Sequence, residues 1–304
     1  MKDIYIDNVS HFLELVENLS NGYPSNQMAN NPVRNHFLFR GMEDYAYELL
    51  PGLFRKTITV TSENKAVNKK YLAFSDEMGI LLNFIQEASA YTKNIPANDY
   101  VRWAELAQHY GVPTRFLDWT ENPLVALYFA CERNSGTDAV VWILHKMNFT
   151  HYANERDKTR VPKTNEANIL DLLTTCPKNK EKYQTLYKSP LIYTPYYFDN
   201  RMSAQASWFM VWGTEQEPLE TMFEDSNYMR IKESEVDVRS CGKNTGNQFV
   251  CKVLVHAYDK QKIIRQLDYM GINAKALFPG LDGVGRHIER IYRFDYNEAC
   301  RAYF

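Results

Sequence analysis

Apolar side chains recur along this chain with helical spacing in some stretches and as short runs in others. Residues 9–19 carry apolar side chains at positions i, i+3, i+4 and i+7, which predicts an amphipathic helix. The same spacing predicts helices over residues 71–91 and 100–110, and Gly111 and Pro113 stand where the second of these would end. The early part of the chain is therefore predicted to be mainly helical.

Short apolar runs bounded by turn residues predict β-strands, most of them in the second half of the chain. The predicted strands cover residues 36–41, 139–145, 191–197, 206–212 and 248–257, and a further short strand is expected after Asn273. Asp259 is expected to cap a helix that Gly271 ends, and a last helix follows a turn built on Pro279 and Gly280.

These elements predict a single α+β domain, with helices early and a mostly antiparallel sheet whose strands are concentrated in the second half. No repeat, low-complexity run or linker divides the chain. We expect residues 1–29 to form an N-terminal helix and loop and residues 30–304 to form the main domain. Residues 148–190 are rich in lysine and asparagine, which predicts an elaborated insertion with a short helix near Ile169.

Composition narrows the class of protein. The chain has 304 residues and a net charge of −2, so it lacks the overall basic field typical of nucleic-acid-binding proteins. Its 5 cysteines form no Cys-x-x-Cys pair, which argues against a disulfide framework and against a zinc site. The N-terminus lacks an apolar signal core, and no window approaches the roughly 18 apolar residues of a membrane span. We therefore expect a cytoplasmic protein with no membrane segment and no metal.

Residues 106–131 are the most informative stretch, and their pattern predicts a helix, a tight turn, a loop and a second helix capped by Thr120. Polar side chains of both charges alternate there with bulky apolar ones, and buried polar groups are costly unless they have partners. Either these side chains bind one another or they bind a ligand. His109 is a core histidine or a general base, and Trp119 anchors the loop or stacks on a ligand ring. The candidates are His109, Thr114, Arg115, Asp118, Trp119, Thr120 and Asn122.

Arg40 ends an apolar strand and precedes Gly41. A guanidinium fixed at a strand end suits a phosphate or a carboxylate, and a glycine lets a ligand or a backbone approach closely. The alternative is a structural arginine paired with a buried carboxylate such as that of Asp118. The sequence leaves both interpretations open.

Further candidates lie in the second half of the chain. Arg201 and Gln205 either share one face of a helix or mark the turn into the next strand, and a glutamine there suits a ligand amide or ribose. Glu215 and Glu217 either share one side of a strand or belong to a solvated turn. Asp282 follows a rigid turn and either caps the last helix or takes part in chemistry.

Several familiar catalytic motifs are absent from the sequence. It contains no Walker-type phosphate loop, no Gly-x-Gly-x-x-Gly, no His-Glu-x-x-His and no Gly-x-Ser-x-Gly. These absences argue against P-loop ATPases, dinucleotide-binding dehydrogenases, zincin proteases and serine hydrolases. A nuclease would draw on Asp118, Glu121 and Asp282, whose spacing matches no recognisable metal site.

The sequence resembles the FRG domain family, in motifs that span roughly residues 30–292. The shared motifs are Phe39-Arg40-Gly41, residues 108–120, residues 122–130, Arg201, Gln205, Phe209 and residues 278–283. One departure is Ser207, where the family tends to place glycine, so a close backbone approach at that position is in question. The family is bacterial and phage-associated, and the resemblance therefore implies a role in phage defence or conflict.

A second resemblance, carried by fewer residues, is to ADP-ribosyltransferases of the Arg–Ser–Glu type, and it implies a fold like theirs. Those enzymes carry an aromatic-Arg-Gly strand, which Arg40 matches, and a Ser-Thr-Ser strand leading into a helix, which Thr114 matches loosely. Their later glutamate has two candidates here, Glu217 and Asp282. The resemblance implies catalytic roles for these residues and NAD as the substrate.

Two functions follow from these candidates. In an NAD-dependent ADP-ribosyltransferase or NAD glycohydrolase, Arg40 would bind the pyrophosphate or ribose, Thr114 would position the nicotinamide, and a carboxylate would stabilise the oxocarbenium ion. In a non-catalytic nucleotide- or ligand-sensing module, Arg40 and Arg115 would be anion anchors. The expected partner is a nucleotide or a protein substrate. A purely structural hydrogen-bond network is the third interpretation.

The expected ligand-binding residues are the same for both functions. They are His109, Arg115, Asp118, Trp119, Thr120, Asn122, Arg201 and Gln205. Both functions require Arg40 to meet the segment around Thr114 and Asp118 at a shared open pocket.

Overall fold

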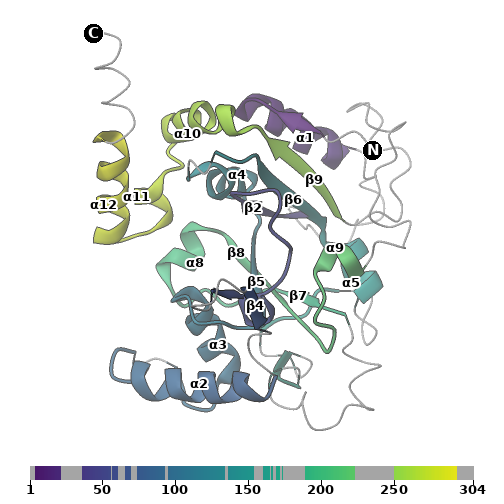
Figure 1. Cartoon of the computed structure of the whole chain (residues 1–304), viewed down its shortest axis with the longest axis vertical. Helices are drawn as coiled ribbons and strands as arrows, with labels where there is room; N and C mark the ends of the chain where they lie inside the picture. Colours follow the sequence, from purple (N-terminus) through teal and green to yellow (C-terminus); the bar gives the residue numbers. More distant parts are fainter. Residues whose placement is uncertain are drawn as a thin grey trace.

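The computed structural model has a seven-stranded sheet at its centre, in the order β1-β9-β6-β2-β5-β8-β7 (Figure 1). β1 is parallel to β9, and the other pairs of this sheet are antiparallel. The strands are β1 (Tyr5–Ile6), β2 (Phe37–Met42), β5 (Phe116–Thr120), β6 (Ala139–His145), β7 (Leu191–Tyr193), β8 (Ser207–Val211) and β9 (Val250–Val255). A separate hairpin consists of β3 (Thr57–Val60) and β4 (Ala66–Lys69).

The structure describes residues 4–21, 36–55, 57–60, 66–69, 74–92, 95–133, 136–153, 160–164, 166, 169–171, 173, 189–222 and 250–292. The α-helices discussed below are α1 (Val9–Asn21), α2 (Phe74–Ala88), α3 (Tyr100–His109), α4 (Pro123–Cys131), α5 (Lys146–Ala153), α8 (Asn200–Ala204), α9 (Leu219–Met222), α10 (Lys260–Tyr269), α11 (Ala274–Leu277) and α12 (Leu281–Arg290).

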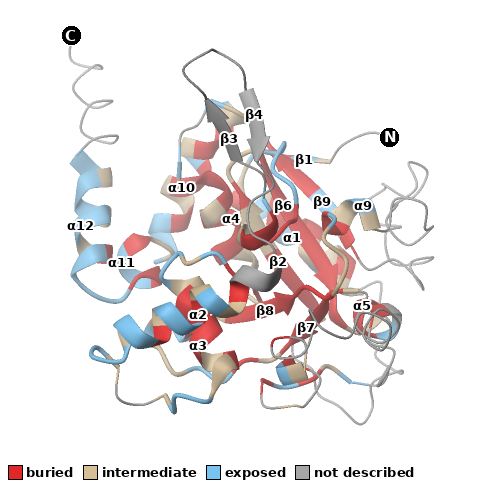
Figure 2. Cartoon of the chain, turned by 60° about the horizontal axis from the view of Figure 1, so that its bottom comes forward, coloured by how far each residue is buried: buried red, intermediate tan, exposed pale blue. Residues whose placement is uncertain are grey.

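Helices cover both faces of the sheet. α1, α4 and α10 lie on one face, and α2 and α3 lie on the other (Figure 1). Side chains alternate between the two resulting cores, as the pleat of a strand requires. In β6, Val141 and Ile143 join the core under α4, whereas Val140 and Leu144 join the core beside α3. β6 and β8 are buried along their whole length (Figure 2), which is why they form continuous apolar runs in the sequence.

The N-terminal segment contributes to this architecture directly. Tyr5 of β1 is in register with Leu254 of β9, so the segment extends the central sheet. Phe12 and Leu15 of α1 are buried in the core under α4, as the helical spacing of residues 9–19 predicts. The predicted first helix is therefore confirmed.

The predicted α+β class and antiparallel sheet are confirmed, with one difference in layout. The strands come from both halves of the chain, and β2, β5 and β6 at the centre all precede residue 146. The predicted helices over 71–91 and 100–110 correspond to α2 and α3, and Gly111 follows α3 with a φ of +80° that favours glycine. Residues 169–171 are helical, as expected near Ile169.

Three local predictions are wrong. Residues 116–120, predicted as loop, form β5 between β2 and β8. Thr120 therefore ends a strand, and Asn122 caps α4 instead, its side chain accepting the Leu124 N–H at 3.0 Å. Residues 274–277, predicted as a strand, form α11, because the Asn273 side chain accepts the Ala276 N–H at 3.1 Å and starts a helical turn.

Close contact between β2 and α4 depends on Gly41. A Cβ atom at this position would lie 2.6 Å from the Ala130 nitrogen and nearer still to the Ala126 carbonyl oxygen. The glycine thus serves the approach of a helix backbone, one of the two uses expected from the sequence. None of the helices in the described part of the chain combines the length and apolar character needed to cross a bilayer.

Candidate functional site

A cavity of about 350 Å³ opens where β2 and β5 separate. β2 pairs with β6 at all six positions from Phe37 to Met42, but it pairs with β5 only between Phe39 and Thr120. Beyond that bridge the two strands diverge, and side chains from β2, β5, α3, α4 and α8 line the space between them. The volume lies within the range of about 300 to 1,000 Å³ of small-molecule sites.

Arg40 joins the two diverging strands. Its Nη1 donates a hydrogen bond to the backbone carbonyl oxygen of Asp118 at 2.6 Å. Burial lowers the pKa of the Arg40 guanidinium to about 10, with Asp118 opposing and Arg55 reinforcing the shift, so the group is cationic at neutral pH. The Nε of Arg40 is buried and has no hydrogen-bond partner among the described residues. The pocket therefore contains a fixed cation with a spare donor.

The side chain of Asp118 is exposed in this pocket and is held by α3. Its Oδ2 accepts a hydrogen bond from Gln108 Nε2 at 2.8 Å. The Oε1 of Gln108 in turn accepts the hydroxyl of Thr114 at 2.6 Å. Thr114 itself is buried and is absent from the pocket lining. The structure thus brings Asp118 into the pocket and places Thr114 behind Gln108, where it cannot contact a ligand directly.

His109 and Arg201 line the side of the pocket formed by α3 and α8. His109 Nε2 lies 3.7 Å from Asp199 Oδ1, but burial, followed by the charge of Arg201, lowers the pKa of the imidazole. The histidine is therefore neutral at pH 7. The pKa of Arg201 is lowered mainly by burial and secondly by the positive charge of Arg286. The Nε of Arg201 is buried and has no hydrogen-bond partner in the described part of the chain.

The segment around Phe278 supports this side of the pocket. The guanidinium groups of Arg201 and Arg286 both lie over the Phe278 ring, 4.5 and 4.6 Å from its centroid. Gln205, which also lines the pocket, donates from Nε2 to the Leu277 carbonyl oxygen at 3.0 Å. Phe278 thus orients Arg201 and Leu277, just before the sequence motif at 278–283, orients Gln205, while neither residue is among the pocket lining.

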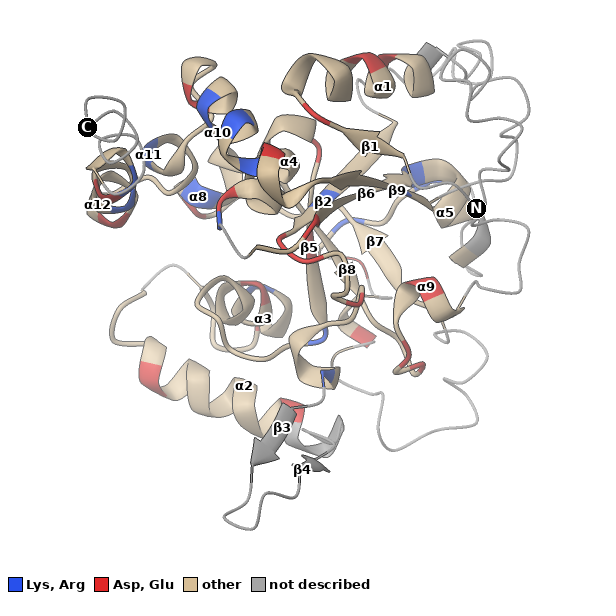
Figure 3. Ribbon diagram, turned by 45° about the horizontal axis from the view of Figure 1, so that its top comes forward, with Lys and Arg blue, Asp and Glu red and all other residues tan. Residues whose placement is uncertain are grey.

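Four lining residues with charge were not predicted from the sequence: Arg55, Arg133, Glu43 and Glu132. With Arg40, Arg201 and Asp118, they give the pocket four arginines and three carboxylates among the described residues. Burial raises the pKa of Glu132, and the neighbouring Arg133 and Arg286 oppose that shift. Figure 3 shows further basic positions on α10 and α12, on the same side of the molecule as α8. The cationic excess favours an anionic ligand.

Arg115 lies outside the pocket, contrary to its predicted role as an anion anchor. It is 1% exposed and forms a buried ion pair with Glu77 of α2, with Nε 2.8 Å from Oε1. Arg115 stands just before β5 and is directed to α2, whereas Asp118 lies within β5 and reaches Gln108 of α3 at the pocket.

Glu217, Asp282 and Asn122 are also absent from the pocket lining. Glu217 lies in an exposed turn, where its carbonyl oxygen accepts the indole N–H of Trp212 at 3.1 Å. Asp282 is exposed in the first turn of α12, where a carboxylate suits the helix dipole, but the N-cap residue is Gly280 and no side chain forms a capping hydrogen bond there. Asn122 is occupied in capping α4. The structure thus brings neither candidate for the later glutamate to Arg40.

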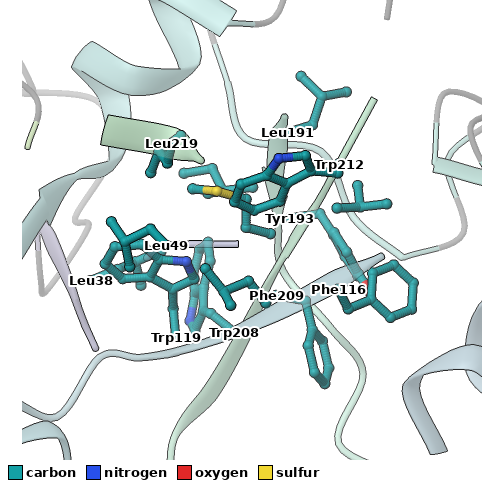
Figure 4. Close-up of a cluster of buried hydrophobic side chains, with 14 of the residues drawn as sticks. Leu38, Leu49, Phe116, Trp119, Leu191, Tyr193, Trp208, Phe209, Trp212 and Leu219 are labelled. Atoms are coloured by element: carbon teal, nitrogen blue, oxygen red, sulfur yellow. The ribbon is translucent and has the colours of Figure 1, made fainter. Parts of the chain in front are cut away.

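Trp119 and Thr120 line the pocket, and their main contacts are with the rest of the protein. The Trp119 side chain is buried in the core beside Trp208, Leu38 and Leu49 (Figure 4), which is the anchoring role weighed in the sequence. The Thr120 hydroxyl donates to the Gln205 carbonyl oxygen at 2.6 Å and joins β5 to α8.

The acidic residues considered for a nuclease are dispersed. Asp118 lies in the pocket, Glu121 pairs with Lys146, and Asp282 is on α12. Within the described ranges, no group of three or more His, Cys, Asp or Glu side chains could hold a metal ion.

Comparison with known proteins gives one family match. Residues 35–139 match the model of the FRG domain. The chain therefore contains an FRG domain over these residues. The matched region of this FRG domain includes Arg40, Gln108 and Asp118, whereas Arg201 and Phe278 come from the part of the chain beyond it. No curated protein and no solved structure matches the chain.

Proposed function

We propose that the pocket binds NAD as a substrate and that the protein transfers the ADP-ribose unit to water or to an acceptor. The observation that carries this proposal is the contact between Arg40 and Asp118, which brings a cationic anchor and a carboxylate into one cavity. The resemblance of Phe39-Arg40-Gly41 to the first strand of ADP-ribosyltransferases supports the same substrate. Consumption of NAD would also suit the role in phage defence that the family resemblance implies.

Arg40 and Arg201 supply the anion-binding part of the proposed site. Both line the pocket, and each has a buried Nε with no hydrogen-bond partner among the described residues. A pyrophosphate oxygen would satisfy such a donor, and the planar guanidinium matches the geometry of phosphate. Stacking on Phe278 limits the orientations of Arg201, so little side-chain freedom would be lost on binding.

Asp118 supplies the carboxylate in place of Glu217 and Asp282. In the reaction, the bond between ribose C1′ and the nicotinamide nitrogen breaks, and its electron pair neutralises the departing nicotinamide. The positive charge that develops on the ribose is stabilised by the nearby carboxylate. Water, or an acceptor side chain of a protein, then attacks C1′ and loses a proton. Neutral His109 is suited to accept that proton.

The test is release of nicotinamide from NAD, measured with and without cell lysate as a source of acceptors. We expect release by the wild type and a loss on the order of a hundredfold in Asp118→Asn. Glu217→Gln and Asp282→Asn are matched controls, because both remove a carboxylate outside the pocket, and we expect wild-type rates from them. Stabilisation by ADP-ribose without nicotinamide release from the wild type would instead support the non-catalytic sensing module.

A further inference from the structure

Asp118 lies beside guanidinium groups but binds none of them through its carboxylate. Arg40 donates to the Asp118 backbone carbonyl oxygen, and the described residues contain no ion pair between Asp118 and an arginine. A carboxylate and a guanidinium form strong bidentate hydrogen bonds when they meet. The hydrogen bond to the Asp118 carboxylate comes instead from an uncharged group.

Gln108 is that group, and its orientation is fixed by its two neighbours. An ionised carboxylate only accepts hydrogen bonds, so the amide NH₂ of Gln108 must face Asp118 Oδ2, at 2.8 Å. The amide oxygen then faces Thr114, whose hydroxyl must donate to it, at 2.6 Å. The hydroxyl oxygen of Thr114 also accepts the Phe116 N–H at 3.2 Å, which leaves its proton directed to Gln108. Thr114 thus prevents the amide from turning over.

We infer that Thr114 and Gln108 are positioning residues that keep the Asp118 carboxylate off the arginines, so that both the anion-binding groups and the carboxylate stay available to a substrate. The purpose assigned to these two residues rests on the proposed function, whereas their hydrogen-bond geometry does not. Thr114 acts here from behind the pocket wall, and Gln108 is the only group through which its hydroxyl reaches Asp118 among the contacts of the described residues.

The geometry is tested by the Gln108 side-chain amide signals in NMR spectra of the full chain, assigned by their loss in Gln108→Leu. Thr114→Ser keeps the hydroxyl and is expected to leave these signals at their wild-type positions. Thr114→Val removes the hydroxyl at nearly constant volume and is expected to move them towards free-amide positions with faster exchange. Amide signals that are identical in wild type and Thr114→Val would overturn the inference.

The consequence for binding is tested with inorganic pyrophosphate as the probe, by calorimetry at a temperature where every variant is folded. We expect Gln108→Leu to bind pyrophosphate at least tenfold more weakly, because Asp118 then pairs with the arginines, and the double variant Gln108→Leu/Asp118→Asn to recover affinity. Unchanged affinity in Gln108→Leu would overturn the inference. If the wild type itself fails to bind pyrophosphate, the proposed function is contradicted, and the amide signals still decide the positioning role.

Discussion

Arg40 Nη1 and the Asp118 carbonyl oxygen lie 2.6 Å apart, across the point where β2 and β5 separate. The two residues are 78 positions apart in the chain. Their contact joins the strand that gives the FRG motif to the strand that gives the long central motif. The same contact places a cation and the residue that carries the carboxylate at one pocket. The proposed chemistry depends on this arrangement.

Replacing Arg40 by lysine should weaken anion binding although the charge is kept. Lysine is a point charge and cannot both bind the Asp118 carbonyl oxygen and present a planar fork to a phosphate. We expect Arg40→Lys to bind ADP-ribose at least tenfold more weakly than the wild type, measured by calorimetry. Lys262→Arg, a substitution on the exposed face of α10, serves as the control and should leave ADP-ribose affinity unchanged.

Gly41→Ala should destabilise the protein through the contact of β2 with α4. The added methyl group would meet the Ala126 carbonyl oxygen and the Ala130 nitrogen, neither of which can move without shifting the helix. We expect a loss of about 3 kcal/mol or more in the free energy of unfolding, measured in urea. Gly79→Ala on α2 has open space around it and should instead stabilise the protein by about 0.5–1 kcal/mol. Equal effects of the two substitutions would contradict the described packing.

The buried pair of Arg115 and Glu77 should affect stability and leave ligand affinity unchanged. Arg115→Met leaves the Glu77 carboxylate buried without its cation, which should cost about 3–5 kcal/mol in the free energy of unfolding. The double variant Arg115→Met/Glu77→Leu should recover most of that loss. Weaker ADP-ribose binding by the folded single variant would restore Arg115 as an anion anchor and contradict its assignment to the core.

The buried carboxyl of Glu105 should make stability fall as pH rises. Burial raises the pKa of Glu105 to about 8, and hydrogen bonds from Tyr193 and Thr164 only partly offset this shift. The folded protein therefore binds a proton at Glu105 more tightly than the unfolded chain does. The resulting contribution of Glu105 to the free energy of unfolding is fully present below about pH 4.5 and is lost as pH rises through about 8.

Glu105→Gln removes this proton linkage and keeps the shape of the side chain. We expect the wild type to lose about 4 kcal/mol relative to Glu105→Gln between pH 5 and pH 8, from urea unfolding at several pH values. Parallel stability profiles for the two proteins would show that Glu105 has an ordinary pKa in the folded state.

The sequence predicts the helices well, because residues such as Phe12 and Leu15 follow a local period that needs no knowledge of the rest of the chain. It also predicts that Arg40 meets the segment around Asp118, although the contact is to the Asp118 backbone carbonyl oxygen and not to a buried carboxylate. The sequence does not predict β5, because its partners, residues 37–42 and 207–211, are remote in the sequence and its apolar run is interrupted by Asp118. A strand's stabilisation comes from such partners rather than from local propensity.

Residues that are close in the sequence have different roles in the site. Arg115 pairs with Glu77 of α2 and Thr114 lies behind Gln108, whereas Asp118 lines the pocket, and these partners are remote in the sequence. The catalytic roles predicted for Glu217 and Asp282 rest on local turn patterns and on a family likeness, and neither shows which carboxylate reaches Arg40. Glu43 and Glu132 stand close to recognised motifs, but only the meeting of β2 with α4 reveals that they line the same cavity.

The most direct test of the central claim is a crystal structure of the protein soaked with ADP-ribose. We predict the pyrophosphate against the guanidinium groups of Arg40 and Arg201, with the terminal ribose C1′ beside the Asp118 carboxylate. ADP-ribose bound elsewhere, or a clear pocket that stays without ligand at saturating concentration, would contradict the account.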